Sequence, residues 1–523
     1  MKKTRIIFSI LSIISYICTV AQALVIDSTF GENGRLFSAW GRLIKSSQIH
    51  FQPNLKILLD GVITQGGDAR HYVTRVSSEG RIDSSFGPSG TLDSRQINRN
   101  SFHPSGIVIL SDSEIVIGGS ANNLYKNSIN LAKIKSDGTL NTHFGDSGLV
   151  VKNFPEASGA GGYYPPLIVR DFVGILIVSQ AKLEPENKVL VHRYSLGGQV
   201  DLTYGKGGIC HINDTALRFL PEVACIYPDG SLIIGSGRGL DRTSFILMRI
   251  SAEGIVDRSF GENGIATVKM GPCSLKKVLI QPDGKILCMG SVGENTWYFG
   301  ACRLSKDGQL DRTYGDNGMV KVGVAPVNYV PVGLGDYFAR VASATLDPEG
   351  GAVIAGVATI DAKNSLMIVR LDEDGVPDRS FGTGGCFLYN FPDGVFTPNS
   401  IAFQDNIRLL VAGKFGPQDW KSDSVLLTRF ILNRNALAIS NTLVIQVAPN
   451  PALGDLIVEV LSAVNKNLQV FLIDRHGRTV ISSEIVQRRT IFNIEHLVSG
   501  MYFLRVWGGG QVNVKKVLIN TSR

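Results

Sequence analysis

The sequence predicts an all-β protein, a seven-bladed β-propeller of four-stranded blades followed by a small Ig-like β-sandwich. A motif of the form Asp/Asn-x-Ser/Thr/His-Phe/Tyr-Gly-x-x-Gly recurs seven times, with its aromatic residue at positions 30, 86, 144, 204, 260, 314 and 381. Short apolar runs separated by Pro-Asp-Gly and Asp-Gly turns lie between the copies. After residue 432 the repeat stops and a series of short strand-like runs follows. A recurrence of this length indicates a propeller, a solenoid or an array.

One repeat unit, residues 274–322, illustrates the four strands of a blade. Its two turns, Pro282-Asp283-Gly284 and Lys306-Asp307-Gly308, are hairpin signals, because Asp caps the turn and Gly supplies positive φ. Four antiparallel strands per unit is the size of a propeller blade. The predicted strands are residues 274–281, 285–291, 297–305 and 318–322.

The two ends of the repeat region predict how the ring closes. The chain enters at the first motif and a fourth-type strand, residues 34–40, whereas the last repeat, residues 399–432, stops after its third strand. We therefore expect the N-terminal strand to complete the last blade, which also removes exposed sheet edges.

A column of basic residues supports this closure. Each third strand carries Arg or Lys, and the first residue of the motif follows eight positions later, so we predict a bidentate ion pair that latches each blade internally. Arg429 has no acid eight residues on, so its partner should be Asp27 from the other end of the chain. Seven separate anion sites are the alternative. The pairs are Arg75 and Asp83, Lys133 and Asn141, Arg193 and Asp201, Arg249 and Asp257, Arg303 and Asp311, Arg370 and Asp378, and Arg429 and Asp27.

The N-terminus predicts export. Lys2, Lys3 and Arg5 precede an apolar run, residues 6–20, which ends at Ala21-Gln22-Ala23. This is the pattern of a secretory signal peptide, residues 1–23, cleaved after Ala23. A membrane anchor is the alternative, but the run is short for a span.

Composition limits the remaining classes. The chain has 523 residues, 44% hydrophobic and 19% charged, with a formal net charge of +7. It contains no long Lys/Arg run, so no nucleic-acid partner is expected. Six cysteines remain after the signal peptide, and because Cys288 and Cys302 stand where other repeats have core side chains, mostly small ones, we expect free buried thiols.

The tandem motif with its intervening turns resembles the bacterial delta-60 repeat and, more distantly, the blades of NHL-type propellers. The resemblance covers roughly residues 27–432. It implies a propeller spanning residues 24–432 but no single activity.

The C-terminal segment resembles the sorting domain of type IX (Por) secretion cargo. The matching pieces are Ala448-Pro449-Asn450-Pro451, Asp474-Arg475-His476-Gly477-Arg478, Gly500-Met501-Tyr502-Phe503-Leu504 and Lys515-Lys516-Val517-Leu518. The resemblance implies the type IX secretion machinery as a partner and passage across the outer membrane of a Gram-negative bacterium. It also implies removal of this domain, often with attachment to surface lipopolysaccharide. We place a linker at residues 433–442 and the domain at residues 443–523, with a plain accessory Ig-like module as the alternative.

No catalytic or metal-binding pattern is evident. The sequence lacks H-x-H, H-E-x-x-H, paired C-x-x-C and G-x-S-x-G motifs, so we expect no cofactor, no metal and no catalytic residue. The segment Asp372-Glu373-Asp374-Gly375 occupies an ordinary hairpin position rather than a calcium loop.

The loops that vary between repeats are the candidates for ligand binding. They join second to third strands and one blade to the next, and lie on the face opposite the uniform turns, where function usually resides. The aromatic candidates could equally cover the blade ends; they are Tyr163, Tyr164, Trp297, Tyr329, Tyr337 and Trp420. We expect an exported, non-catalytic surface or secreted protein that binds a glycan or a protein. The alternatives are a carbohydrate-active lyase or hydrolase that uses the propeller funnel, and a structural surface component.

Overall fold

The computed structural model describes most of the residues that follow the predicted signal peptide. The predicted signal peptide and linker lie outside the described residues. The described residues are 24–38, 43–65, 68–97, 102–110, 113–123, 126–154, 166–183, 186–213, 219–237, 242–293, 296–323, 337–360, 363–417, 424–432, 445–448, 452, 454–460, 468–475, 478–485, 489–508 and 511–520.

Six antiparallel sheets of four strands follow one another along the chain, and within each sheet the strands are neighbours in chain order. The first sheet also carries a short helical turn, η1 (Pro88–Gly90), and a helix, α1 (Ser94–Ile97). The first three sheets are β3 (Leu43–Phe51), β4 (Ile57–Gln65), β5 (Asp68–Val76) and β6 (Thr91–Asp93); β7 (Phe102–Ile109), β8 (Ile115–Asn123), β9 (Lys126–Ile134) and β10 (Leu149–Phe154); and β11 (Leu167–Arg170), β12 (Gly174–Leu183), β13 (Glu186–Ser195) and β14 (Ile209–Asn213). The next three are β15 (Val223–Ile226), β16 (Leu232–Ser236), β17 (Ser244–Ile250) and β18 (Ile265–Lys269); β19 (Cys273–Ile280), β20 (Ile286–Val292), β21 (Tyr298–Leu304) and β22 (Met319–Val322); and β23 (Tyr337–Leu346), β24 (Ala352–Ile360), β25 (Lys363–Leu371) and β26 (Cys386–Tyr389).

A seventh sheet combines the two ends of this region. Its strands β27 (Val395–Phe403), β28 (Arg408–Gly416) and β29 (Ser424–Leu432) are joined by β1 (Leu24–Ile26) and β2 (Arg35–Ser38) from the N-terminus. Both pair antiparallel with β29, with Leu24 opposite Leu432 and Arg35 opposite Thr428. The N-terminal segment therefore supplies the outer edge of the last sheet.

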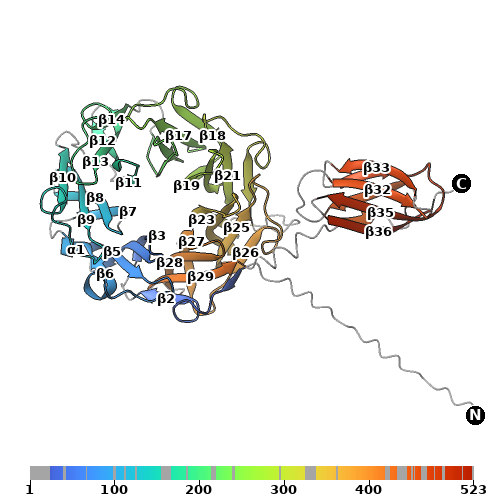
Figure 1. Ribbon diagram of the computed structural model, residues 1–523, viewed down its shortest axis with the longest axis horizontal. Coiled ribbons are helices and arrows are strands. Elements are labelled where there is room, and N and C mark those ends of the chain that lie inside the picture. Colours follow the sequence, from blue (N-terminus) through green and yellow to red (C-terminus); the bar gives the residue numbers. More distant parts are fainter. Residues whose placement is uncertain are drawn as a thin grey trace, which may run out of the picture.

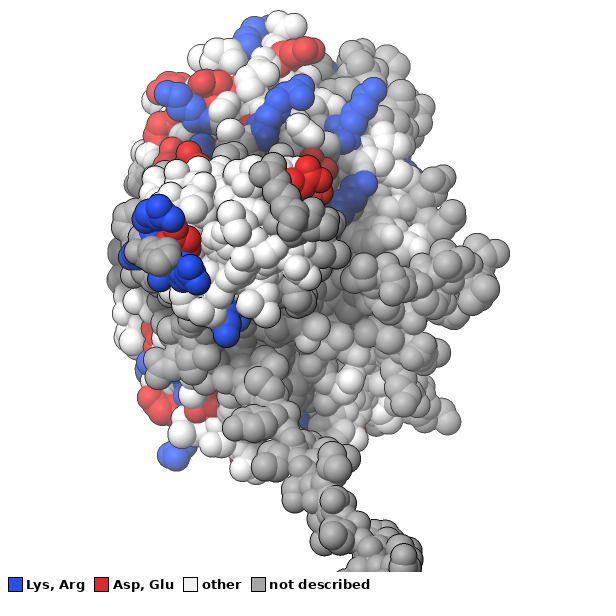
Figure 2. Space-filling model, turned by 90° about the vertical axis from the view of Figure 1, so that its right-hand side faces the viewer, with Lys and Arg blue, Asp and Glu red and all other residues white. Residues whose placement is uncertain are grey.

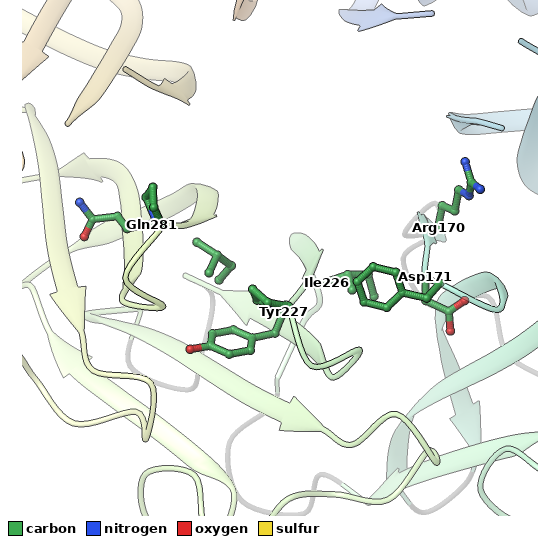
Figure 3. A pocket seen from close by; sticks show the side chains of 9 residues that line it. Arg170, Asp171, Ile226, Tyr227 and Gln281 are labelled. Carbon is green, nitrogen blue, oxygen red and sulfur yellow. The ribbon is translucent and has the colours of Figure 1, made fainter. Parts of the chain in front are cut away.

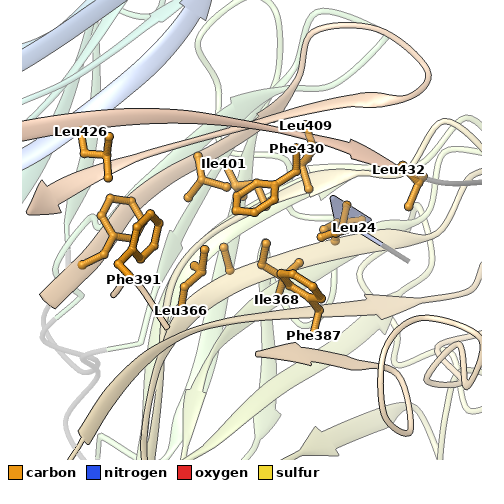
Figure 4. Close-up of a cluster of buried hydrophobic side chains, with 14 of the residues drawn as sticks. Leu24, Leu366, Ile368, Phe387, Phe391, Ile401, Leu409, Leu426, Phe430 and Leu432 are labelled. Atoms are coloured by element: carbon orange, nitrogen blue, oxygen red, sulfur yellow. The ribbon is translucent and has the colours of Figure 1, made fainter. Parts of the chain in front are cut away.

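The sheets are arranged around a ring (Figure 1). The inner strands of successive sheets are in contact, and β27 of the seventh sheet contacts β3 of the first. Each junction between neighbouring sheets has its own cluster of buried apolar side chains. Figure 4 shows the cluster between the sixth and seventh sheets, where Leu24 and Leu432 lie beside Phe387 and Phe430. Burial of apolar surface at every junction is what holds these sheets side by side.

The C-terminal region is a separate β-sandwich. One sheet contains β30 (Ile445–Ala448), β31 (Asp455–Val460) and β34 (Arg489–Asn493). The other contains β33 (Thr479–Ile485), β32 (Leu468–Asp474), β35 (Gly500–Gly508) and β36 (Gln511–Ile519). Both sheets contribute to one buried cluster that includes Val458, Leu472 and Leu504. The two inner faces thus form a single core.

All six cysteines after the signal peptide are free thiols in the structure. Cys210, Cys273, Cys288 and Cys302 are buried. Burial raises the pKa of Cys210 and of Cys386 to about 11, so both stay protonated and unreactive at neutral pH.

Candidate functional site

The repeated motif forms an ion-pair latch inside each regular sheet, and Arg303 on β21 shows its geometry. Arg303 Nε donates to Asp311 Oδ2 at 2.8 Å, and the guanidinium carbon lies 4.7 Å from the centre of the Tyr314 ring. Asp311 Oδ1 accepts hydrogen bonds from the Thr313 backbone N–H at 3.1 Å and its hydroxyl at 2.6 Å. Burial pushes the Asp311 pKa upward, but these hydrogen bonds, together with Lys285 and Arg303, hold it well below its usual value. Asp311 is therefore a carboxylate at neutral pH.

The same arginine also ties one sheet to the next. Arg303 Nη1 donates to the backbone carbonyl of Glu373, which lies in the β25–β26 hairpin of the sixth sheet. The Gly315 N–H donates to the Asp374 carbonyl of that hairpin at 2.8 Å. Both hydrogen bonds join the fifth sheet to the sixth, so the motif acts as a clamp between sheets as well as a latch within one sheet. The sequence predicted only the latch, because a hydrogen bond to another repeat produces no fixed spacing between two residues of one repeat.

Four other junctions repeat this arrangement. In each, the arginine Nε donates to its aspartate within 2.8 Å and Nη1 donates to a carbonyl of the next sheet's hairpin. Arg429 pairs with Asp27 at 2.7 Å, across 402 positions of sequence, and its side chain is only 3% exposed. The arginine, aspartate and carbonyl residues are Arg75, Asp83 and Ser136; Arg193, Asp201 and Ala252; Arg249, Asp257 and Lys306; and Arg429, Asp27 and Ser78.

The expected pair of Lys133 with Asn141 is wrong. Lys133 Nζ instead lies 2.7 Å from Glu114 Oε2, and Asn141 Nδ2 donates to Glu114 Oε1 at 2.8 Å. A neutral amide cannot balance a buried ammonium, so the glutamate of the β7–β8 turn supplies the negative charge between them.

Arg370 in the sixth sheet pairs with Asp378, as expected, but has further acidic partners. Its Nε donates to Asp347 Oδ2 at 2.8 Å and its Nη2 to Glu349 Oε2 at 2.6 Å. Three carboxylates therefore share one guanidinium.

Most of the aromatic ligand candidates cannot be placed. Tyr163, Tyr164, Tyr329 and Trp420 lie outside the described residues, and for Tyr337 only the backbone, at the start of β23, is described. Trp297 is half-buried just before β21, and its carbonyl accepts a hydrogen bond from the Ala339 N–H of the sixth sheet at 3.0 Å.

A pocket of about 580 Å³ opens where three successive sheets present their first turns. Its lining is mainly apolar, and Phe172 is 74% exposed. Figure 3 shows the lining side chains in an arc, with Gln281 at one end, Ile226 and Tyr227 between, and Arg170 at the other. The lining residues are Arg170, Asp171, Phe172, Ile226, Tyr227, Pro228, Ile280, Gln281 and Pro282.

Hydrogen bonds fix the polar residues of this pocket. Tyr227 donates its hydroxyl to the Gly284 carbonyl at 2.6 Å, and Gln281 Nε2 donates to the Gly350 carbonyl at 2.9 Å. Asp171 Oδ1 accepts from the Val173 N–H at 2.9 Å. The pocket lies at the first turns, on the face opposite the variable loops that the sequence analysis favoured, and its walls are held rigid by neighbouring sheets.

A second polar cluster lies within the first sheet. Asp60 on β4 is buried between two imidazoles, with His50 Nε2 2.9 Å from one carboxylate oxygen and His71 Nε2 3.2 Å from the other. Burial pushes the Asp60 pKa upward, and the two histidines lower it by more, so its pKa lies far below the usual value. The side chain of His50 is 26% exposed. Since a carboxylate only accepts hydrogen bonds, both Nε2 atoms carry the proton.

The pocket beside Phe172 and the cluster around Asp60 each correspond to a departure from the repeat pattern in the sequence. Phe172 and Val173 put two adjacent apolar side chains into a turn where three other repeats have Pro-Asp-Gly or Pro-Glu-Gly. Asp60 is the one charged residue in its column of the seven repeats. The aligned residues, placed by strand register, are Gly118, Val178, Gly235, Met289, Ala355 and Ala412.

Other kinds of site are absent from the part of the chain that is described. Within it no group of three or more His, Cys, Asp and Glu side chains is arranged to hold a metal ion. No helix among the placed residues is long and apolar enough to span a membrane. Lys and Arg side chains are interspersed with Asp and Glu on the face shown in Figure 2.

Two family models match the chain. Residues 446–520 match the secretion system C-terminal sorting domain, and residues 110–144, 281–314 and 353–381 match the β-propeller domain of unknown function DUF5122. The protein is therefore a β-propeller protein with a C-terminal sorting domain of type IX secretion, which directs it to the cell surface or the exterior. The predicted propeller and sorting domain are confirmed.

Several solved structures show a weak likeness. They include a protein of unknown function from Dyadobacter fermentans, with 12% identity, 76% of this chain and 100% of that chain covered, and a TM-score of 0.35. Drosophila Semaphorin 2a has 7% identity, coverage of 92% and 98%, and a TM-score of 0.35. A PL25 ulvan lyase has 10% identity, coverage of 74% and 78%, and a TM-score of 0.30. With TM-scores under 0.5, none of these supports an inference about this chain. No curated protein matches it.

Proposed function

We propose that this is an exported, non-catalytic binding protein built on a seven-bladed β-propeller, residues 24–432. The N-terminal strands β1 and β2 complete the blade that begins with β27, an assignment supported by the pairing of Leu24 with Leu432 and by the ion pair of Asp27 with Arg429. Cleavage after Ala23 makes Leu24, the first residue of β1, the mature N-terminus. A linker, residues 433–442, joins the propeller to an Ig-like domain, residues 443–523, that directs type IX secretion.

The pocket beside Phe172 is the observation that carries the binding proposal. Its volume of about 580 Å³ lies within the range of small-ligand sites. Phe172 and the adjacent Val173 are 74% and 62% exposed at this turn, and contiguous exposed apolar surface marks interaction sites. The mainly apolar lining with a few fixed polar groups suits a saccharide ring or a peptide side chain.

A matched pair of variants tests this proposal. On a glycan array and a peptide array, the mature protein should retain at least one ligand, and Phe172→Ala should weaken its binding about tenfold, a loss typical of an interface anchor. Leu202→Ala removes another exposed apolar side chain, 71% exposed, from the motif turn of the same sheet and should leave binding unchanged. Binding that Phe172→Ala does not alter would refute the pocket as the site.

One observation favours a second candidate, a carbohydrate-active lyase or hydrolase. The Asp60 carboxylate accepts a hydrogen bond from Nε2 of His50, whose side chain is 26% exposed, so Nδ1 is left as a base, the arrangement of a general acid–base pair. Polysaccharide turnover by the purified protein that disappears in both His50→Ala and Asp60→Asn would establish this reading over binding. An inert array together with no turnover would favour a structural surface component.

A further inference from the structure

We propose that Cys288 and Cys302 form a disulfide across β20 and β21 in the exported protein. The two residues are directly opposite each other in the antiparallel ladder, and both are completely buried. Directly opposed residues of an antiparallel ladder carry their side chains on the same side of the sheet, so the two thiols are neighbours in the core between the fourth and fifth sheets.

The backbone geometry accommodates the bond. Directly opposed residues of an antiparallel pair have Cα atoms about 4.5–5.5 Å apart, inside the range of about 4.4–6.8 Å found for disulfides. The Cβ atoms of such a pair are about 4.5–5.5 Å apart, whereas a disulfide brings them to about 3.5–4.5 Å. Closing the bond thus requires a small local twist of β20 against β21, without movement of the sheet.

Export of the chain provides the oxidising conditions that a disulfide requires. The sorting domain directs the protein out of the cell, and exported chains pass through an oxidising compartment. In the reaction the two thiols lose two protons and two electrons, a sulfur–sulfur bond forms between them, and a protein disulfide that acts as oxidant is reduced to two thiols. Because neither sulfur is exposed in the folded protein, the exchange takes place before the fourth sheet packs over the fifth.

The other thiols are less suitable partners. Cys225 and Cys273 belong to the same cluster between the fourth and fifth sheets, but Cys225 lies opposite Ile233 and Cys273 lies opposite Val292. Cys210 and Cys386 lie opposite Val191 and Val369. Among the six cysteines, Cys288 and Cys302 alone are paired with each other in a ladder. The bond would close the β20–β21 hairpin covalently, in the sheet that supplies Ile280 and Pro282 to the pocket.

Peptide mapping of the protein recovered from the cell surface or medium tests the proposal. The protein is denatured and alkylated without reductant, then digested. We expect the Cys288 and Cys302 peptides to be linked, with a mass lower by two hydrogen atoms, and the other four cysteines to be alkylated. Complete alkylation of Cys288 and Cys302, or a link from either to Cys225, would overturn it.

Thermal unfolding with and without reductant provides the second readout. Wild-type protein should show a lower Tm with reductant, and the variant carrying Cys288→Val and Cys302→Ala should show no such difference. These replacements are the residues that other repeats carry at the same positions, Val411 and Ala132. If the double variant does not fold, the peptide map of the wild-type protein decides by itself.

Discussion

Two junctions of the ring differ in how one sheet holds the next. Between the fifth and sixth sheets, Arg303 reaches the Glu373 carbonyl of an intact hairpin. Between the sixth and seventh, the third and fourth strands of the receiving sheet come from opposite ends of the chain, and β29 continues to Leu432 opposite Leu24. No continuous hairpin is there to receive Arg370, and its remaining donors bind Asp347 and Glu349 within its own sheet.

Aromatic packing takes the place of these bonds at the second junction. Phe387 lies edge-on to Phe430 of the seventh sheet, with ring centres 5.9 Å apart, and Tyr389 lies edge-on to the same ring at 5.8 Å. Such pairs contribute about 0.5–1.5 kcal/mol each beyond their buried area. The comparison shows that the latch within a sheet depends on local spacing, whereas the clamp between sheets depends on an unbroken hairpin.

Removing residues 24–38 should have the largest effect on the stability of the propeller. The truncation deletes β1 and β2, exposes the edge of β29, and takes Asp27 from Arg429 and Leu24 from the closing cluster. We expect loss of cooperative thermal unfolding and aggregation during size-exclusion chromatography, since an unpaired edge strand recruits other chains. A cooperative, monomeric truncated protein would contradict closure by the N-terminus.

Arg429→Ala should lower the free energy of unfolding by about 3–5 kcal/mol, because it leaves the Asp27 carboxylate buried and unpaired. Chemical denaturation measures the loss. Adding Asp27→Asn to the variant removes the stranded charge and should recover part of the stability. No recovery in the double variant would mean that the aspartate charge is not what the arginine balances.

The variants Gly375→Ala and Gly384→Ala distinguish the cost of a clash between neighbouring sheets from the cost of backbone strain. Both glycines have positive φ, +80° and +64°. A Cβ at Gly375 would lie 2.6 Å from the Tyr314 ring of the neighbouring sheet, whereas nothing lies within 4 Å of one at Gly384. We expect Gly384→Ala to cost about 1 kcal/mol and Gly375→Ala about 1–3 kcal/mol more, from overpacking. Equal losses in denaturant unfolding would argue against interlocked sheets.

The pH dependence of stability should be the smallest effect. The folded-state pKa values of Asp27 and Asp311 are lowered from 3.8. Their contribution is complete above that unfolded value and is lost as the pH falls through the lower folded values. The thermal midpoint of wild-type protein should therefore fall as the pH drops below about 4. Asp311→Asn should fall less steeply over the same range; an identical slope would show that this carboxylate does not titrate with unfolding.

Much of this fold could be predicted from the sequence, and individual residues show why. Because the motif recurs, a residue missing from one copy can be recognised by comparison with the others. Arg429 has no acid eight positions later, and this absence predicted its pairing with Asp27 at the other end of the chain. The series of short strand-like runs after residue 432 is likewise confirmed, as strands β30 to β36 of the C-terminal sandwich. By contrast, Lys133 and Asn141 occupy the expected backbone positions, but their side chains do not pair with each other, since both bind Glu114.

What the sequence by itself determined is the repeat, the four strands of each unit, the pairing of the chain ends and the C-terminal sorting domain. These follow from local spacing, turn chemistry and alternation of apolar residues, all of which act over short stretches of chain. Only the tertiary structure decided which hairpin each arginine clamps, that three first turns meet around Phe172, and that His50 and His71 enclose Asp60. Those contacts join residues of different strands or sheets, and their positions depend on how the strands and sheets pack.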